Sequence, residues 1–447
     1  MVGELFQLLY IGELLSTVGP STGVNMQKQS DHEVVIVGAG VAGLSCARVL
    51  QERGIGFTLL EKTDRPGGRI KTDRVDGFNL DHGFQVLQTG YPGISKYLHL
   101  HDLKLSSFPS GVAIRYDKKF HIIADPRRHP LSFYSTMAAP VGSVGDRLKL
   151  LKLAGSLARR PMEHIFESPE EPALDFLNRW GFSARFIQSF FTPFFAGACL
   201  DLSMQGSSRV LKYVTRLFNT GDAALPAKGM GAIANQIAAS LPDQYIRYNQ
   251  EVVKVEKGQV TLADGSVIEA QHIVVAVSQA VCARLLDIDA PADSVAEACL
   301  YFGSDWQPPF NHPFLVLNGD ASGPVNNVAF PSLVASTYAP PGNTLIAVVV
   351  LGDNFIHNDD LENLVRRQLA EWFGPEVQRW EHIKTLAIHH ALPRQTPPTS
   401  NPYHLPQPHS EGIRICGEHQ SLPGLLWALM SGDMAGRSLV ESKKVAA

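Results

Sequence analysis

The chain has 447 residues, is 45% hydrophobic and 18% charged, and carries a formal net charge of −4. These values are typical of an ordinary globular protein and exclude a disordered or fibrous one, and the length favours two closely joined domains. Basic residues never run longer than two in a row, so a nucleic-acid partner is not expected.

The five cysteines are scattered, odd in number and form no CxxC pair: Cys46, Cys199, Cys282, Cys299 and Cys416. Such usage favours the cytoplasm or another reducing compartment and gives no cysteine metal site. We therefore expect no bound metal.

Residues 1–31 are predicted to be an N-terminal extension outside the fold. They contain an apolar stretch, but Glu4 and Glu13 interrupt it and no basic residue precedes it. This makes a poor secretory signal and a poor transit peptide, and the stretch is too short to span a membrane. Two interpretations stay open: a spurious start upstream of Met26, or a short interfacial helix that gives peripheral membrane contact.

The next segment predicts a strand that turns into a helix through glycines. A run of β-branched residues ends in Gly38, Gly40 and Gly43, with Val41 and Ala42 between the last two as further expected contacts, and a helical pattern follows from Leu44. In such a turn the first glycine permits the sharp bend, the second lets a diphosphate approach the main chain, and the third lets the helix pack on the sheet. The amides and dipole of the helix N-terminus then hold the phosphates.

A second predicted strand, 57–60, is followed directly by Glu61 and Lys62. The carboxylate stands about 20 residues past the glycines, where it can accept hydrogen bonds from ribose hydroxyls. Shortly afterwards come Gly68, whose backbone allows close approach, and Arg69, whose guanidinium can pair with phosphate oxygens.

A predicted hairpin then leads into Gly83, Phe84 and Gln85. Together these segments resemble the flavin amine oxidase superfamily, which includes phytoene desaturases and protoporphyrinogen oxidases. The resemblance implies that the acid, the Gly-Gly-Arg and the segment ending at Gln85 wrap an FAD. With no cysteine placed like those that attach flavin in some relatives, the FAD is expected to be non-covalent.

The resemblance extends to the far end of the chain, where Gly417 and Glu418 form the expected closing turn and Leu425 and Leu426 begin the last helix. It implies that Glu418 serves the ribityl or phosphate side of FAD and that the helix amides face the flavin ring. A helix N-terminus stabilises the negative charge that reduction places there. In the same way, the resemblance implies that the Val252 backbone meets the adenine.

The fold implied by this resemblance is α/β. We expect a discontinuous, Rossmann-like FAD-binding domain of the GR2 type at 32–93, 226–290 and 405–447. An inserted α+β substrate domain with a helical cap would then occupy 94–225 and 291–404.

The first insertion is predicted to be mostly helical, with helices at 146–158 and 172–180. Six phenylalanines follow at near-helical spacing between 182 and 195. A core helix is the plainer interpretation, and an edge that lines an apolar substrate tunnel is the sharper one. The second insertion has strand-like runs at 314–317, 327–330 and 344–350 and a predicted helix at 360–373.

The catalytic side chains stay unknown at this level. Amine oxidases of the superfamily keep a lysine beneath the flavin, but no lysine occurs from 258 to 383, so that lysine is missing or replaced. His389 and His390 are weak candidates for a proton acceptor, because histidine titrates near neutrality. As neighbours in an extended segment they point to opposite faces, so at most one could face the flavin.

Three functions stay open. The first is an FAD-dependent desaturase or dehydrogenase that removes a hydride from a small apolar substrate, in an enzyme of unknown oligomeric state. The second is an amine or amino-acid oxidase that lacks the usual lysine. The third is a flavoprotein whose FAD has a mainly structural role or whose main task is binding a partner.

Overall fold

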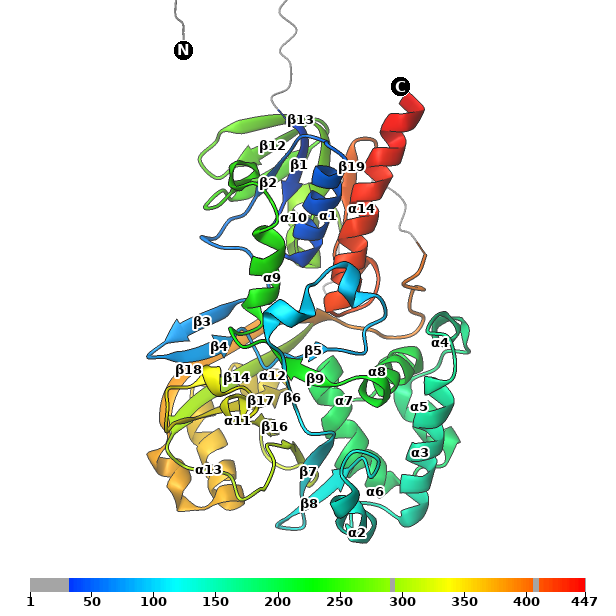
Figure 1. The fold of residues 1–447 in the computed structure, drawn as a ribbon, viewed down its shortest axis with the longest axis vertical. Helices are drawn as coiled ribbons and strands as arrows, with labels where there is room; N and C mark the ends of the chain where they lie inside the picture. Colours follow the sequence, from blue (N-terminus) through cyan, green and yellow to red (C-terminus); the bar gives the residue numbers. More distant parts are fainter. Residues whose placement is uncertain (1–31, 290–293, 405–409, 447) are drawn as a thin grey trace, which may run out of the picture.

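The structure is a computed structural model that describes residues 32–289, 294–404 and 410–446. The predicted extension 1–31 lies outside these residues. Two seven-stranded sheets organise the chain, one in the upper part of Figure 1 and one in the lower part, with a group of helices beside the lower sheet.

The upper sheet has the strand order β10-β2-β1-β13-β12-β11, and β19 pairs with β13. The pairings among β10, β2, β1, β13 and β19 are parallel, whereas β11, β12 and β13 form an antiparallel meander. Its strands are β1 (His32–Val37), β2 (Phe57–Leu60), β10 (Ile246–Arg247), β11 (Val252–Glu256), β12 (Gln259–Leu262), β13 (Val267–Val275) and β19 (Ile413–Ile415).

Helices cover both faces of this sheet, which explains why β1 is apolar without interruption. Val34 and Ile36 pack in a core with α1 (Val41–Glu52), α9 (Gly231–Ala238) and α14 (Leu425–Ala446). Val35 and Val37 face the opposite core, which includes residues of α10 (Gln279–Leu286). Among the described helices, none is long and apolar enough to cross a membrane.

The lower sheet has the order β18-β14-β17-β16-β15-β7-β8. Its strands are β7 (Gly111–Tyr116), β8 (Lys119–Ala124), β14 (Ser294–Ser304), β15 (Leu315–Asn318), β16 (Val325–Ala329), β17 (Thr344–Leu351) and β18 (Glu381–Pro393). One face packs on α13 (Leu361–Phe373), with the short helices α11 (Pro331–Val334) and α12 (Asp353–Ile356) nearby. The other face receives residues of the hairpin β3 (Thr72–Val75) and β4 (Phe78–Asp81).

The helical group at the lower right of Figure 1 forms a cap beside the lower sheet. A small sheet of β5 (Leu87–Gln88), β9 (Ala223–Leu225) and β6 (Ser106–Ser107) links it to the upper part. The cap helices are α2 (Phe133–Ala138), α3 (Val144–Ala158), α4 (Glu163–Glu167), α5 (Ala173–Trp180), α6 (Ala184–Phe186), α7 (Thr192–Cys199) and α8 (Ser208–Thr220).

The expected mixed α/β class is confirmed, and the predicted strands and helices of the insertions are found within a few residues. The domain boundaries stay a prediction. The strand β14 was not predicted, nor was the β7–β8 hairpin of the first insertion. The phenylalanine-rich segment is not one α-helix, because Ile187–Phe191 adopts a π-helical turn between α6 and α7.

Candidate cofactor and substrate site

The three glycines of the first turn meet three different surroundings. Gly38 has φ +102°, and a Cβ there would lie 2.7 Å from the carbonyl oxygen of Ala276. A Cβ on Gly43 would overlap the carbonyl oxygen of Gly38. At Gly40, by contrast, a Cβ would meet no atom within 4 Å. Two glycines are therefore required by the fold itself, whereas Gly40 faces open space.

That open space lies at the N-terminus of α1, where Gly40 is the capping residue and provides no side-chain cap. No acidic residue occupies the first turn of the helix, which starts at Val41 and Ala42. The first amides of a helix lack intrahelical partners and attract negative charge. This arrangement fits a diphosphate, which can approach the main chain at Gly40.

Glu61 follows β2 and turns back toward the glycine turn. Its Oε2 accepts a hydrogen bond of 2.9 Å from the amide of Ala39, and its Oε1 accepts from the amide and hydroxyl of Thr63. The main chain of Gln250 donates to the Glu61 carbonyl, which brings the start of β11 and Val252 close to this strand end. Lys62 is exposed. These positions are compatible with the roles expected for Glu61 and Val252, which stay predictions.

A polar chain joins Arg69 to the start of α14. Arg69 donates to Glu418 and to the carbonyl of Ala391, and Glu418 accepts a 3.1 Å hydrogen bond from the amide of Gly424, just before Leu425. The neighbouring Gly68 is exposed with φ +59°. The structure thus brings together Arg69 and Glu418, which are 349 positions apart in the sequence.

The α14 helix also lies tightly on α1. A Cβ on Gly432 would overlap the carbonyl oxygen of Ala42, and the amide of Gly417 donates to the Ser431 hydroxyl at 3.0 Å. Leu426 is fully buried and Leu425 is half-buried. The N-termini of both helices therefore belong to one packed unit.

Several buried polar atoms near this unit have no partner among the described residues. They include Oε1 of Gln85 and both ring nitrogens of His419. Burial, together with the nearby Arg69, lowers the pKa of His419 to about 4, so the ring is neutral at neutral pH. Orphaned buried polar atoms are costly in a protein that has no ligand to satisfy them. With the open space at Gly40, they fit a polar cofactor that spans these segments.

One functional candidate was missed by the sequence analysis, namely Glu297 of β14. Alternate residues of this strand face opposite ways: Ala298 and Leu300 pack toward α13, whereas Cys299 and Tyr301 face the β3–β4 side. Glu297 belongs to the second set, and a Cβ on Gly83 would overlap its Oε1. The available signal was a single carboxylate in an otherwise apolar strand.

Glu297 is 6% exposed, and no described residue hydrogen-bonds or pairs with its carboxylate. Burial raises its pKa to about 7. The adjacent segment is held firmly, because the Tyr301 hydroxyl donates to the carbonyls of Asp81 and Gly83, and Gln85 donates to the carbonyl of Arg69. Phe84 packs against the same face of the lower sheet.

The two histidine candidates lie elsewhere. Ile388 of β18 faces Gly83, and the ring of the next residue, exposed His389, stacks on His357 at 5.1 Å. His390 is exposed too, and its Nδ1 lies 2.6 Å from the Ser294 hydroxyl. Neither ring is placed in the buried surroundings of Glu297, so the structure favours the carboxylate over both histidines.

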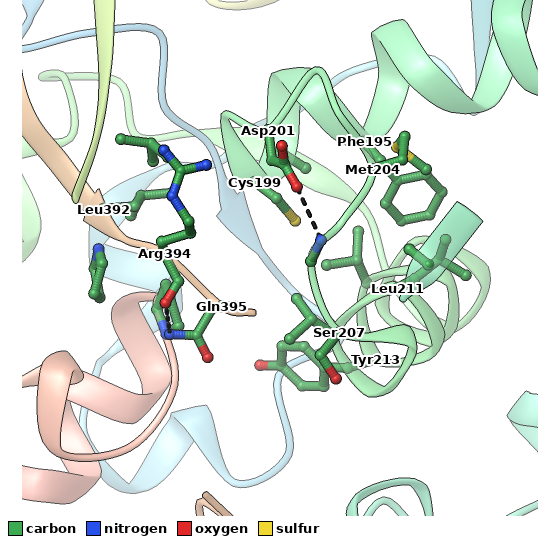
Figure 2. Close-up of a pocket in the computed structure, with 18 residues that line it drawn as sticks. Phe195, Cys199, Asp201, Met204, Ser207, Leu211, Tyr213, Leu392, Arg394 and Gln395 are labelled. Atoms are coloured by element: carbon green, nitrogen blue, oxygen red, sulfur yellow. Dashed lines mark hydrogen bonds between the residues drawn. The ribbon is translucent and has the colours of Figure 1, made fainter. Parts of the chain in front are cut away.

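A largely apolar pocket lies between the cap and the lower sheet, beside the start of α14. Figure 2 shows Leu392, Arg394 and Gln395 from the end of β18 and beyond on one side, opposite residues of α7, α8 and their connecting loop. The cavity has a volume of about 70 Å³, and about 690 Å³ of space lies within it and its open mouth together. The apolar lining residues include Phe195, Met204, Val210, Leu211, Val214, Val295, Leu392, Pro393 and Pro423.

Two neighbours tie this pocket to the cofactor side. Pro423 directly precedes the Gly424 amide that donates to Glu418, and Val295 precedes Glu297 by two positions, on the same face of β14. Asp201 also lines the pocket, but its carboxylate is used by the amides of Ser203 and Gly206. Of the phenylalanine cluster, Phe195 lines the pocket and the other buried members form the cap core.

Curated relatives match only short segments. An L-amino-acid oxidase of Crotalus adamanteus is 44% identical over 75 residues, which are 17% of this chain and 14% of the relative. Hydroxyneurosporene desaturase of Rubrivivax gelatinosus is 48% identical over 52 residues, 12% of this chain and 10% of the relative. These two matches span about a seventh and a tenth of the relatives' own lengths.

Solved structures match nearly the whole chain at low identity and show the fold alone. An oxidoreductase from Methanosarcina mazei has a TM-score of 0.69 at 19% identity, covering 92% of this chain and 100% of that one. Putrescine oxidase bound to putrescine has a TM-score of 0.66 at 14% identity, covering 92% and 99%. The model of the flavin-containing amine oxidoreductases matches residues 41–434. The chain is therefore a member of the flavin-containing amine oxidoreductase family and an FAD-dependent oxidoreductase.

Proposed function

We propose that the protein is a dehydrogenase or desaturase that oxidises a small apolar substrate bound in the pocket between cap and lower sheet. The observation that carries this proposal is the pocket itself, whose walls are mainly aliphatic and which adjoins both the start of α14 and the strand that carries Glu297. Apolar walls with few polar groups favour a ligand that is itself apolar.

The residues that would hold FAD are those of the cofactor side. The α1 amides at Gly40 would bind the diphosphate, Glu61 the ribose, and the start of α14 the flavin end. When bound, FAD supplies a two-electron oxidant that accepts a hydride.

Forming a double bond removes one hydrogen from each of two neighbouring carbons, one as a hydride and the other as a proton, so the site needs a proton acceptor. Glu297 can hold that proton on an Oε atom, and its raised pKa of about 7 suits such a role near neutral pH. The apolar pocket orients the substrate and excludes water around the reacting carbons.

The deciding experiment is anaerobic titration of the FAD-loaded protein with two panels, one of apolar polyenes and porphyrinogens and one of amines and amino acids. If the proposal is right, at least one polyene or porphyrinogen bleaches the flavin absorbance. Bleaching with the second panel alone would instead support an amine or amino-acid oxidase. If dithionite bleaches the flavin and neither panel does, the proposal fails and a structural or binding role is favoured.

A matched pair of variants separates pocket binding from general damage. Leu392→Trp fills the pocket with a larger side chain, whereas Leu286→Trp makes the same change at a half-buried position of α10, away from the pocket. We expect the first variant to raise the substrate KM at least tenfold and the second to leave it unchanged. Equal effects of the two changes would remove the pocket from the proposal.

A further inference from the structure

The outer side of the cap exposes large apolar side chains where the chain enters α2. Leu131 is 99% exposed and Tyr134 is 82% exposed, and Phe133 between them is exposed as well. The rings of Phe133 and Tyr134 contact each other edge to face at 5.6 Å. Single exposed apolar residues are ordinary, but three within four positions are not.

A second group lies on α3, which contacts α2. Val144, Leu148 and Leu151 follow a spacing of four and three residues, so they share one face of the helix, and all three are exposed. Leu153 and Leu157 on the opposite face are buried in the cap core. The helix is thus apolar on two sides, and packing within the chain uses only one of them.

Basic residues accompany these apolar groups. Residues 127–160 contain seven lysines and arginines and a single acid, in a chain whose net charge is −4. That acid, Asp146, is buried and caps α3. Arg127 and Arg128 pair with Asp125 and Asp222, so the remaining basic residues of this segment are those of α3 and its C-terminal end.

Three of those basic residues are exposed, namely Lys152, Arg159 and Arg160, and none of them forms an ion pair with a described residue. Lys152 and Arg159 are seven positions apart and follow the apolar stripe along the same face of α3. The face therefore begins apolar at Val144 and ends basic at Arg159.

We propose that this surface of the cap, formed by two neighbouring apolar groups (Leu131, Phe133 and Tyr134, and Val144, Leu148 and Leu151 of α3) with Lys152 and Arg159 on the α3 face and Arg160 just beyond the helix, docks on an anionic lipid surface. Lysines and arginines beside exposed aromatic and aliphatic side chains are the combination that binds the boundary between lipid headgroups and acyl chains. An almost fully exposed leucine three positions before an exposed tyrosine suits insertion between lipids. The proposal does not depend on the substrate.

Flotation of the full-length, FAD-loaded protein with vesicles tests this inference. One set of vesicles contains phosphatidylcholine alone, and the other contains phosphatidylcholine with 30% phosphatidylserine. We expect at least tenfold stronger binding to the anionic vesicles at low salt, and most of that difference lost at high salt, because counterions screen the surface charge. Equal binding to both vesicle types, or no binding to either, would overturn the proposal.

Variants assign the binding to this face. Replacing Lys152, Arg159 and Arg160 by glutamine should weaken anionic binding about 100-fold, since each cation contributes about fivefold. Leu131→Ser with Tyr134→Ser should weaken it as well. Val253→Ser with Val267→Ser, which alters two exposed apolar residues of the upper sheet, is the matched control and should bind like the unchanged chain.

Two results would contradict the lipid surface as the occupant. One is unaltered vesicle binding in both cap variants while their thermal unfolding matches that of the control. The other is a dimer in solution that Leu148→Ser with Leu151→Ser converts to a monomer, because a second copy of the chain would then be what covers this face.

Discussion

Gly432 of α14 lies directly against the backbone of Ala42 in α1, and any side chain at 432 would overlap the Ala42 carbonyl oxygen. One turn further along, a Cβ on Gly436 would lie 2.8 Å from Cβ of Val49. The last helix of the chain is therefore fixed on the first, and their N-termini both lie at the expected cofactor site.

This close packing predicts that Gly432→Ala destabilises the apoprotein. The two helices must separate to admit the methyl group, which we expect to cost about 1–3 kcal/mol of unfolding free energy and to weaken FAD binding. Gly155→Ala in α3, where a Cβ meets nothing within 4 Å, is the control and should leave stability unchanged or raise it by up to about 1 kcal/mol. Denaturant unfolding and FAD titration measure both effects, and equal stability of the two variants would contradict the packing argument.

The glycine turn allows fold and cofactor effects to be separated. Gly40→Ala should leave apoprotein stability within about 0.5 kcal/mol, because φ is −69° and the added methyl meets no atom of the chain. It should nevertheless weaken FAD binding at least tenfold, since the methyl enters the space where a diphosphate would approach the main chain.

Gly38→Ala is the matched experiment, and unlike Gly40→Ala it should lower the stability of the apoprotein. Its φ of +102° and the nearby Ala276 carbonyl make alanine strained, so the apoprotein itself loses about 1–3 kcal/mol. Isothermal titration with FAD and denaturant unfolding are measured on both variants. FAD affinity in Gly40→Ala equal to that of the unchanged chain would show that the diphosphate does not lie there.

Local sequence patterns predicted the parts of the fold that short-range physics controls. The β-branched run before Gly38 could only be a buried strand, and the glycine spacing required a turn into a helix. The first insertion was harder. The helix predicted at 146–158 carries two apolar stripes, and periodicity does not say which of them is buried: Leu148 and Leu151 are exposed, whereas Leu153 and Leu157 are buried.

The candidate site shows the same limit. Glycines and Glu61 could be assigned because one short stretch of chain holds them at characteristic spacings. Glu297 could not be named, because what singles it out as a candidate is its contact with Gly83, more than 200 residues away in the chain. The hydrogen bond from the Tyr301 hydroxyl to the Gly83 carbonyl joins residues that are 218 positions apart in the same way. Residue type and spacing contain no record of which strand face meets which loop.

The Arg69–Glu418 pair predicts energetic coupling between the two ends of the chain. Arg69→Gln and Glu418→Gln should each weaken FAD binding, and the double variant should lose less than the sum of the two. We expect a coupling energy of about 1–3 kcal/mol, because the Glu418 carboxylate is nearly buried and also accepts from Gly424. FAD dissociation constants of the four proteins measure it, and strictly additive losses would show that the pair does not act as a unit.

The buried carboxyl of Glu297 predicts a distinctive pH dependence. Its pKa rises from 4.5 in an unfolded chain to about 7 in the folded one, because burial disfavours the charged form. Between these two values the folded state binds the extra proton, so the contribution of Glu297 to stability is fully present below pH 4.5 and is lost as pH rises through about 7. At pH 8 the cost of the buried charge reaches at most about 3 kcal/mol.

Glu297→Gln removes this titration, so the variant should gain stability over the unchanged apoprotein as pH rises from 5 to 8. Asp81, whose pKa burial raises to about 6, is common to both proteins and cancels in the difference. Glu269→Gln at an exposed position of β13 should show no such trend. A stability difference that stays constant from pH 5 to 8 would mean that Glu297 is charged throughout, and would contradict the raised pKa on which its proposed role as a proton acceptor near neutral pH rests.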